Sequence, residues 1–212
     1  MVDWHPAKRF LMKQTAYTLS LITVFLLFIQ AHRPGDYAVG DRVEDFSLMG
    51  VDGQYVSLKN YPSAKGFFVI FTCNHCPYAQ LYEQRIIELH KKYAPKGYPV
   101  IAINPNDPEI VPEDSFEEMQ KRAKAKRYPF AYAFDADQTV FRVFGATRTP
   151  HVFLLDADYV VRYIGAIDDN PELAASAQNK FAENAVEALL RGERPTLDFT
   201  RAVGCKIKYR AK

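Results

Sequence analysis

Several features that mark other classes of protein are missing from this 212-residue sequence. The formal net charge is only +2, and 23 basic and 24 acidic residues remain once the first 35 residues are set aside. A nearly neutral body gives no electrostatic reason to expect a nucleic-acid partner. The sequence also lacks a glycine-rich phosphate loop and an internal repeat, so we expect one folded domain without an organic cofactor.

Cysteine is scarce as well, with only Cys73, Cys76 and Cys205 in the chain. A structural zinc site usually takes four ligands, often from two Cys-x-x-Cys pairs, and this sequence has a single pair. A c-type haem site needs a histidine directly after the second cysteine, where this sequence has Pro77. The odd number of cysteines leaves Cys205 without an evident partner.

The cysteine pair lies at the junction of a strand pattern and a helix pattern. Residues 67–71 are all apolar and show no alternation, which predicts a strand buried on both faces. Pro77 suits the first turn of a helix, and apolar residues recur at three- and four-residue steps from Tyr78 to Tyr93. Both thiols would then lie at a helix N-terminus, where free N–H groups and the helix dipole favour the thiolate.

This arrangement suits thiol–disulfide exchange. Only a thiolate attacks a disulfide, and a second thiol must be near enough to resolve the mixed disulfide. His75 lies inside the loop, and a protonated imidazole there would stabilise a neighbouring thiolate. An inert structural disulfide and a metal site remain the alternatives at this point.

The N-terminus is typical of a targeting segment. Lys8, Arg9 and Lys13 precede an uncharged apolar run at residues 15–29. Fifteen helical residues span about 22 Å, which is short of the roughly 30 Å hydrocarbon core of a bilayer. We therefore expect residues 1–35 to be a signal peptide or an uncleaved signal anchor. Either one leaves the body extracytoplasmic, periplasmic or secreted, with membrane contact only through an uncleaved run.

The remaining patterns predict an α/β domain over residues 37–191. An Asp52-Gly53 turn between two strand patterns predicts an N-terminal hairpin. The order of the later elements requires a central mixed sheet flanked by helices. A C-terminal tail, residues 192–212, carries Cys205. The predicted strands cover 43–48, 55–58, 67–71, 99–104, 130–134, 151–156 and 159–164, and the predicted helices cover 78–93, 116–125, 138–144 and 170–191.

A proline directly precedes one of the apolar strands, in the segment Thr149-Pro150-His151. Proline cannot donate a hydrogen bond to a strand ladder, so it belongs at the first residue of the strand. A cis peptide bond at such a position would be a deliberate feature of the fold.

Together these motifs resemble the thioredoxin fold, and more closely the peroxiredoxin-like branch of the redoxin (AhpC/TSA) superfamily. The resemblance extends from Tyr37 to Tyr209. It implies a thioredoxin-like fold in which a cis-proline loop lies beside the dithiol. The motifs that carry it are VGDRVEDFSL, FTCNHCPYA, AINPND, PEDSFEEM, YPFAYAFDADQ, GATRTPHVFLLD, GAIDDNP and GCKIKY.

The resemblance also implies roles for single residues. Cys73 would be the exposed attacking cysteine and Cys76 the buried resolving cysteine, with a Cys73–Cys76 disulfide in the oxidised state. Pro150 would be the cis-proline, and Thr149 would offer its backbone to an extended substrate. The loop residues that would tune the thiol pKa values are Asn74, His75 and Pro77.

The sequence departs from the family pattern at two places. Thioredoxins often carry a buried acid on the strand before the dithiol, and residues 67–71 supply none. Cys76 aligns with the peroxidatic cysteine of peroxiredoxins, but Cys73 replaces the threonine that they place three residues earlier. Their activating arginine has no clear match, and Arg148 is near the site only in the sequence.

We therefore predict an extracytoplasmic thiol–disulfide oxidoreductase that acts through Cys73 and Cys76. Its partners would be a disulfide-containing protein or a small thiol substrate, together with an upstream redox partner. A hydroperoxide reductase that uses Cys76 as an antioxidant is the first alternative. Handling of copper or zinc by Cys73, Cys76 and His151 is the second. Cys205 is either a third redox cysteine that docks on the site from the tail or an idle thiol.

Overall fold

The computed structural model describes residues 36–210. The predicted targeting segment, with its apolar run at residues 15–29, lies outside the described residues. Within the described part, no helix has both the length and the apolar character needed to cross a bilayer.

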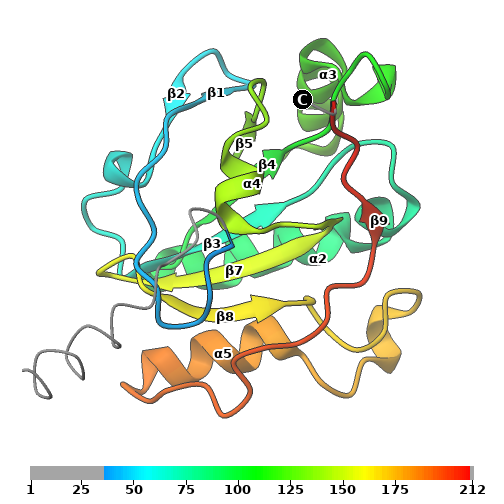
Figure 1. Ribbon diagram of the computed structural model, residues 1–212. Coiled ribbons are helices and arrows are strands. Elements are labelled where there is room, and N and C mark those ends of the chain that lie inside the picture. Colours follow the sequence, from blue (N-terminus) through cyan, green and yellow to red (C-terminus); the bar gives the residue numbers. More distant parts are fainter. Residues whose placement is uncertain (1–35, 211–212) are drawn as a thin grey trace, which may run out of the picture. The chain divides into compact units, whose positions relative to one another are not determined.

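A seven-stranded mixed sheet forms the centre of the domain, with its strands in the order β2-β1-β5-β4-β3-β7-β8 (Figure 1). The central strand β3 is parallel to β4 and antiparallel to β7. All six of its residues are buried, which confirms the prediction for residues 67–71. The strands are β1 (Leu48–Gly50), β2 (Tyr55–Val56), β3 (Gly66–Phe71), β4 (Val100–Asn104), β5 (Ala131–Phe134), β7 (His151–Asp156) and β8 (Val161–Gly165).

Helices cover both faces of this sheet. On one face, Ile86 of α2 and Val186 of α5 pack with strand residues such as Phe68. On the other face, Phe144 of α4 and Phe46 of the N-terminal segment pack with alternate strand residues. The helices are α2 (Pro77–Tyr93), α3 (Phe116–Lys126), α4 (Val140–Phe144) and α5 (Phe181–Leu190), with 3-10 turns η1 (Leu58–Asn60), η2 (Ala94–Lys96), η3 (Pro112–Asp114) and η4 (Ala174–Ser176).

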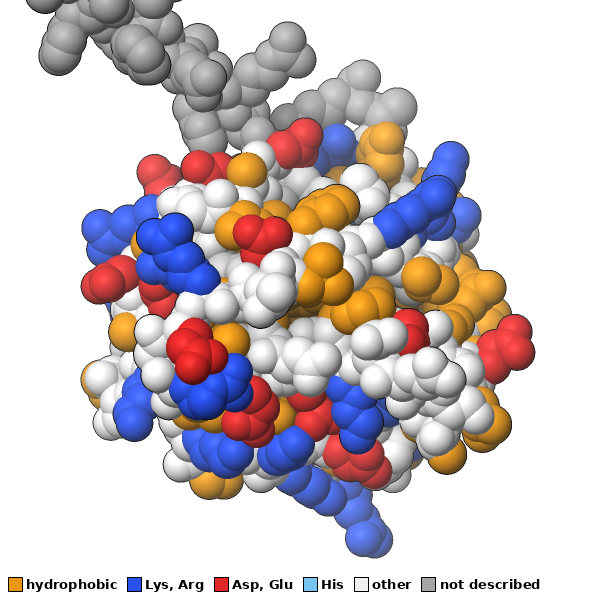
Figure 2. All heavy atoms as spheres, turned by 90° about the horizontal axis from the view of Figure 1, so that it is seen from below, with side chains coloured by type: hydrophobic (Ala, Val, Ile, Leu, Met, Phe, Trp, Pro, Cys, Tyr) orange, Lys and Arg blue, Asp and Glu red, His pale blue; other side chains and the backbone are white. Residues whose placement is uncertain are grey.

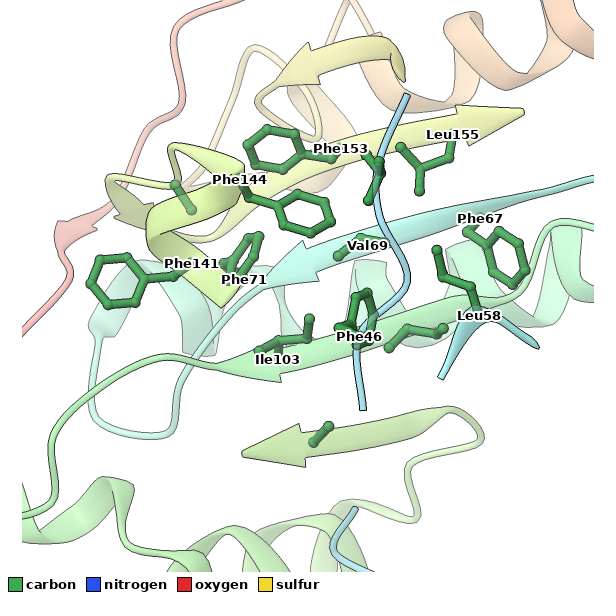
Figure 3. Close-up of a cluster of buried hydrophobic side chains, with 14 of the residues drawn as sticks. Phe46, Leu58, Phe67, Val69, Phe71, Ile103, Phe141, Phe144, Phe153 and Leu155 are labelled. Carbon is green, nitrogen blue, oxygen red and sulfur yellow. The ribbon is translucent and has the colours of Figure 1, made fainter. Parts of the chain in front are cut away.

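Phenylalanines from separate parts of the chain fill the core beneath α4 (Figure 3). Phe71 and Phe153 come from neighbouring strands, and their rings lie 5.3 and 5.2 Å from that of Phe144. Phe46 meets the same ring at 6.2 Å. These edge-to-face pairs add to the stabilisation from burial alone. The cluster holds α4 against the end of β3 that leads into the cysteine pair.

The last helix is shorter than predicted, because the helix expected over residues 170–191 begins only at Phe181. The segment before it folds around Arg85 of α2. The Arg85 guanidinium donates to both carboxylate oxygens of Asp168, at 2.8 and 2.7 Å, and to the carbonyl oxygen of Asn170, at 2.6 Å. A further bond to the Pro171 carbonyl oxygen, at 2.9 Å, helps to hold this segment against α2 in a non-helical conformation.

The C-terminal tail packs onto the domain. Its strand β9 (Cys205–Lys206) pairs with β6 (Arg148–Thr149) in a second, two-stranded sheet. Ile207 is buried, and Figure 1 shows the tail running from α5 back along the domain toward α3. Among the described residues, the tail and the rest of the domain thus belong to the same compact unit.

Charged side chains of both signs are mixed on the surface. Figure 2 shows lysines and arginines interspersed with acids across the face that is seen from below. Charged residues also pair between helices of the domain, as Lys96 of η2 does with Glu187 of α5 at 3.3 Å. A mixed pattern of this kind produces no large field of one sign on that face.

Replacing Arg85 with methionine would leave the Asp168 carboxylate buried without its cation. Their side chains are 11% and 5% exposed, so we expect Arg85→Met to lower the free energy of unfolding by about 3 kcal/mol. The control Lys92→Met removes the cation of the Lys92–Glu183 pair, in which Lys92 is half exposed, and should cost at most about 1 kcal/mol. Urea unfolding measures both losses, and equal losses would contradict the prediction.

Candidate redox site

The cysteine pair lies where the central strand passes into α2. Cys76 is the N-cap residue of the helix and Pro77 is its first residue, as the sequence pattern predicted. Cys73 is 5% exposed and Cys76 is fully buried. The resemblance implied an exposed Cys73, and that expectation is wrong, because Thr149 and Cys205 pack against the pair.

The Thr149–Pro150 peptide bond is cis, as the resemblance implied. The hydroxyl oxygen of Thr149 lies 3.2 Å from Cys73 Sγ. Its carbonyl oxygen lies 3.2 Å from Cys76 Sγ. One residue of the cis-proline loop therefore contacts both sulfurs, so the loop and the dithiol form a single site.

The backbone of Thr149 is not open to an extended substrate. In the register of the small sheet, Thr149 pairs with Cys205. Gly204 fits so closely that a Cβ there would lie 2.1 Å from the Thr149 carbonyl oxygen. The tail thus occupies the ladder position that the resemblance assigned to a substrate strand, and that assignment is wrong.

A buried carboxylate, Asp114 of η3, holds the loop between the cysteines. Its Oδ1 accepts hydrogen bonds from the backbone N–H groups of Asn74, at 2.6 Å, and His75, at 3.2 Å. Its Oδ2 lies 2.5 Å from His75 Nδ1 and accepts a bond of 2.8 Å from Asn106 Nδ2. The site therefore has a buried acid, but this acid comes from a distant turn rather than from residues 67–71.

Asp114 does not stand out in the sequence, because the Pro-Glu-Asp-Ser segment at residues 112–115 is equally typical of an exposed helix start. The available signal was the PEDSFEEM motif, to which the resemblance assigns no role. The same turn also fixes Asn74, whose Nδ2 donates to the Glu113 carbonyl oxygen at 2.8 Å. From the other side, the Tyr132 hydroxyl donates to Asn74 Oδ1 at 3.1 Å. The loop between the cysteines is therefore held rigidly.

Hydrogen bonds favour a negative charge on Cys76. Its pKa is lowered to about 4, chiefly by a hydrogen bond from Cys73 and further by bonds from the Cys205 side chain and the Ala79 backbone N–H. The pKa of Cys73 is raised, first because it shares its proton with Cys76, then because it is buried and near the Asp114 carboxylate. These contacts therefore favour a thiolate on Cys76 over one on Cys73.

Residues 39–164 match the AhpC/TSA family, which is more than half of the chain. The chain belongs to this family. A solved structure of an uncharacterized conserved protein from Geobacillus kaustophilus is 34% identical to it, with a TM-score of 0.78. That similarity covers 83% of this chain and 94% of the other.

More distant relatives carry functional names. Thiol-disulfide oxidoreductase ResA of Bacillus thuringiensis subsp. konkukian is 23% identical over 120 residues, which is 57% of this AhpC/TSA protein. The match spans only 65% of the length of that relative. A thiol:disulfide interchange protein of the thioredoxin family from Chlorobium tepidum is 19% identical, with a TM-score of 0.51, over 60% of this chain and 86% of the other. The fold of the AhpC/TSA protein is thus thioredoxin-like.

Two residues that the sequence placed near the site have other contacts in the AhpC/TSA protein. The ring of His151 packs on Phe153 at 4.8 Å, and its Nδ1 accepts a hydrogen bond from the Thr147 N–H at 3.4 Å. Burial lowers the pKa of His151 to about 4. Arg148 donates to the Gly204 carbonyl oxygen at 2.7 Å. Neither set of contacts supports the metal-binding or arginine role that was considered.

A different set of potential metal ligands lies together at the site. Atoms of Cys73, His75 and Asp114 all lie within 4.8 Å of one another, whereas the predicted set was Cys73, Cys76 and His151. Asp114 already accepts bonds from His75 and from two backbone N–H groups. A metal ion would have to break the His75–Asp114 contact, so the cluster is better explained as a support of the cysteine loop.

The charge distribution predicts how the thiols titrate. The reduced protein should show the ultraviolet absorbance of one thiolate at neutral pH, lost only as the pH falls through about 4, because the thiolate on Cys76 is stabilised. Cys76→Ser should remove this absorbance, whereas Cys205→Ser should retain most of it. The prediction fails if the absorbance appears only at alkaline pH, or if it survives in Cys76→Ser and disappears in Cys73→Ser.

Proposed function

We propose that this AhpC/TSA protein is a thiol–disulfide oxidoreductase in which Cys73 and Cys76 cycle between a dithiol and a disulfide. The observation that carries the proposal is the position of the pair at the start of α2, with Thr149 in contact with both sulfurs. The similarity to a relative named thiol-disulfide oxidoreductase supports the same class of reaction. We take Cys73 as the attacking sulfur because it retains some exposure, whereas Cys76 has none.

The two cysteines divide the reaction between them. As Cys73 Sγ attacks one sulfur of the substrate disulfide, its proton passes to Cys76 in the same step, so no free Cys73 thiolate has to accumulate. A mixed disulfide forms as the substrate S–S bond breaks, and the departing sulfur takes the proton from Cys76. The Cys76 thiolate then attacks Cys73 Sγ. This step forms the Cys73–Cys76 disulfide and releases the second substrate sulfur as a thiolate.

The shape of the site bears on the substrate. Because β9 pairs with Thr149, a small disulfide fits the site better than an extended polypeptide strand. A depression on the surface lies beside the loop between the cysteines, and a small substrate would approach from there. Its lining includes Asn74, His75, Gln80, Glu113 and Lys121. An upstream redox partner would return two electrons to the disulfide after each cycle.

A hydroperoxide reductase is the second candidate, and the lowered pKa of Cys76 favours it. In that reaction the Cys76 thiolate attacks one peroxide oxygen, becomes a sulfenic acid and releases an alcohol or water. Cys73 then displaces water from the sulfenic acid and forms the same disulfide. The bond from Arg148 to the Gly204 carbonyl oxygen weighs against this candidate, because it engages the nearest arginine in the sequence elsewhere.

Single-turnover thiol release tests the assigned roles. In a Cys205→Ser background, pre-reduced protein mixed with hydroxyethyl disulfide should release two thiols per chain. Adding Cys76→Ser should limit release to one thiol and trap a mixed disulfide on Cys73, which intact-protein mass spectrometry detects. Adding Cys73→Ser instead should abolish release.

The outcomes separate the candidates. Release of one thiol per chain from the variant without Cys73, with a mixed disulfide on Cys76, would refute the role of Cys73 as the attacking sulfur. No release from any variant would refute the oxidoreductase, and rapid consumption of hydrogen peroxide by the same preparation would then support the second candidate. Circular dichroism of each variant confirms that the fold is retained.

We also propose that the protein acts outside the cytoplasm, on the strength of the basic residues and the apolar run near its N-terminus. Residues 1–40 fused to alkaline phosphatase, which is active only after export, should give an active enzyme in bacterial cells. Replacing two leucines of the run, Leu26 and Leu27, with arginine should abolish the activity, because charge in the apolar segment opposes membrane insertion. An inactive fusion with the natural segment would overturn this proposal.

A further inference from the structure

Cys205 is held beside the dithiol by the backbone of the tail. Its register partner in the small sheet is Thr149, the residue that contacts both Cys73 Sγ and Cys76 Sγ. Directly opposite residues of an antiparallel pair are about 5 Å apart. Cys205 is half buried and packs against Cys73, Cys76 and Ala79. The chain thus brings all three of its cysteines to one place.

Cys205 packs against the pair, and it is coupled to Cys76 in particular, because each of these two cysteines shifts the pKa of the other. The sulfur of Cys76 therefore has a cysteine neighbour from the loop, Cys73, and another from the tail.

The tail is fastened on both sides of Cys205. Before it, the Gly204 carbonyl oxygen accepts a bond from Arg148 at 2.7 Å. After it, the Ile207 N–H donates to the Thr147 carbonyl oxygen at 3.2 Å, and the Lys208 N–H donates to Asn106 Oδ1 at 2.8 Å. Asn106 also bonds to Asp114, so the tail and the cysteine loop share one support. These bonds keep the position of Cys205 fixed relative to Cys76.

We propose that Cys205 is a third redox-active cysteine that exchanges into a Cys76–Cys205 disulfide and so frees Cys73. This inference rests on the proposed function, since it takes the Cys73–Cys76 disulfide as its starting point. In this proposal the tail itself provides the thiol that reacts with the Cys73–Cys76 disulfide. It also means that the sulfur nearest to the substrate route returns to the reduced state before any external reductant arrives.

The exchange step balances without an additional reactant. The Cys205 thiolate attacks Cys76 Sγ in the Cys73–Cys76 disulfide, the Cys76–Cys205 bond forms, and the bond to Cys73 breaks. Cys73 leaves as a thiolate and takes the proton that Cys205 has lost. One disulfide and one thiol are present before and after the step, so no net oxidation occurs.

The charge on Cys76 favours attack by Cys205 only after the Cys73–Cys76 disulfide has formed. In the reduced protein, burial and then the neighbouring Cys76 thiolate raise the pKa of Cys205 to about 11. Once Cys76 is part of a disulfide it carries no charge, so that second cause disappears. Cys205 is therefore a poor nucleophile in the reduced state and a better one in the oxidised state.

Disulfide mapping in single-cysteine-deleted full-length chains tests the proposal. Each protein is equilibrated with oxidised and reduced glutathione, quenched with acid, alkylated and digested with trypsin. We expect Cys73→Ser to link the peptide of residues 66–85, which contains Cys76, to the peptide of residues 202–206, which contains Cys205. We expect Cys76→Ser to give little of the link between Cys73 and Cys205, at least tenfold less at the same glutathione ratio.

A pair of tail variants provides the control. Gly204→Ala should reduce the Cys76–Cys205 link several-fold in the Cys73→Ser background, because the added Cβ would collide with the Thr149 carbonyl oxygen. Val203→Ala, at a partly exposed neighbouring position, should leave the link unchanged. When all three cysteines are present, Gly204→Ala and Val203→Ala should form the Cys73–Cys76 disulfide equally well.

The results distinguish this inference from the proposed function. If the natural chain forms the Cys73–Cys76 disulfide but Cys73→Ser keeps two free thiols at every glutathione ratio, the role of Cys205 is refuted and the oxidoreductase stands. Equal links from Cys205 to both site cysteines would also refute the preference for Cys76. If the natural chain forms no intramolecular disulfide at all, the proposed function itself fails.

Discussion

The carboxylate of Asp114, buried beneath the cysteine loop, is the interaction on which the site depends. A helix N-terminus leaves several backbone N–H groups without partners, and here the loop that precedes the helix is enclosed in protein. Asp114 accepts bonds from two N–H groups of that loop and contacts His75. Without this acceptor, burial of the loop would strand polar groups at a cost of about 1–3 kcal/mol each.

The same carboxylate influences the chemistry of the pair. Its negative charge lies on the side of Cys73 and helps to raise the pKa of that thiol. The helix N-cap lies on the side of Cys76, where N–H groups accommodate an anion. The two sulfurs are alike in the sequence, and they differ in the folded protein because one faces a carboxylate and the other faces backbone donors. In the proposed reaction, attack by Cys73 therefore requires its proton to pass to Cys76.

Local patterns were enough to predict the parts of the fold that local physics determines. The unbroken apolar run of β3, the Pro77 helix start and the Asp52-Gly53 hairpin were confirmed. The resemblance to the thioredoxin fold correctly implied the cis Thr149–Pro150 peptide bond. The start of the last helix was wrong, because the segment before Phe181 is held by Arg85 of another helix. No periodicity within residues 170–191 could reveal that contact.

The candidate site was harder to predict than the fold, because its second half comes from far along the chain. Asp114 is 40 residues from Asn74, to which it bonds. Cys205 is a pair partner of Thr149 only through the sheet register. Neither the Asp114–Asn74 contact nor the Cys205–Thr149 pairing produces a repeating pattern in the sequence. The acids of residues 112–115 also look like ordinary residues at the start of a helix. The exposed Cys73 and the open Thr149 edge were both wrong for the same reason, since the tail covers them.

Because the tail covers the backbone edge of Thr149, a free peptide would have to compete with it for that edge. A strand tethered to its own binding edge by a short connection competes at an effective concentration in the millimolar range or above. A free peptide of ordinary affinity would rarely displace it, whereas a molecule small enough to pass beside the loop would not need to. Under the proposed function, the tail would therefore restrict the dithiol to disulfides of small bulk.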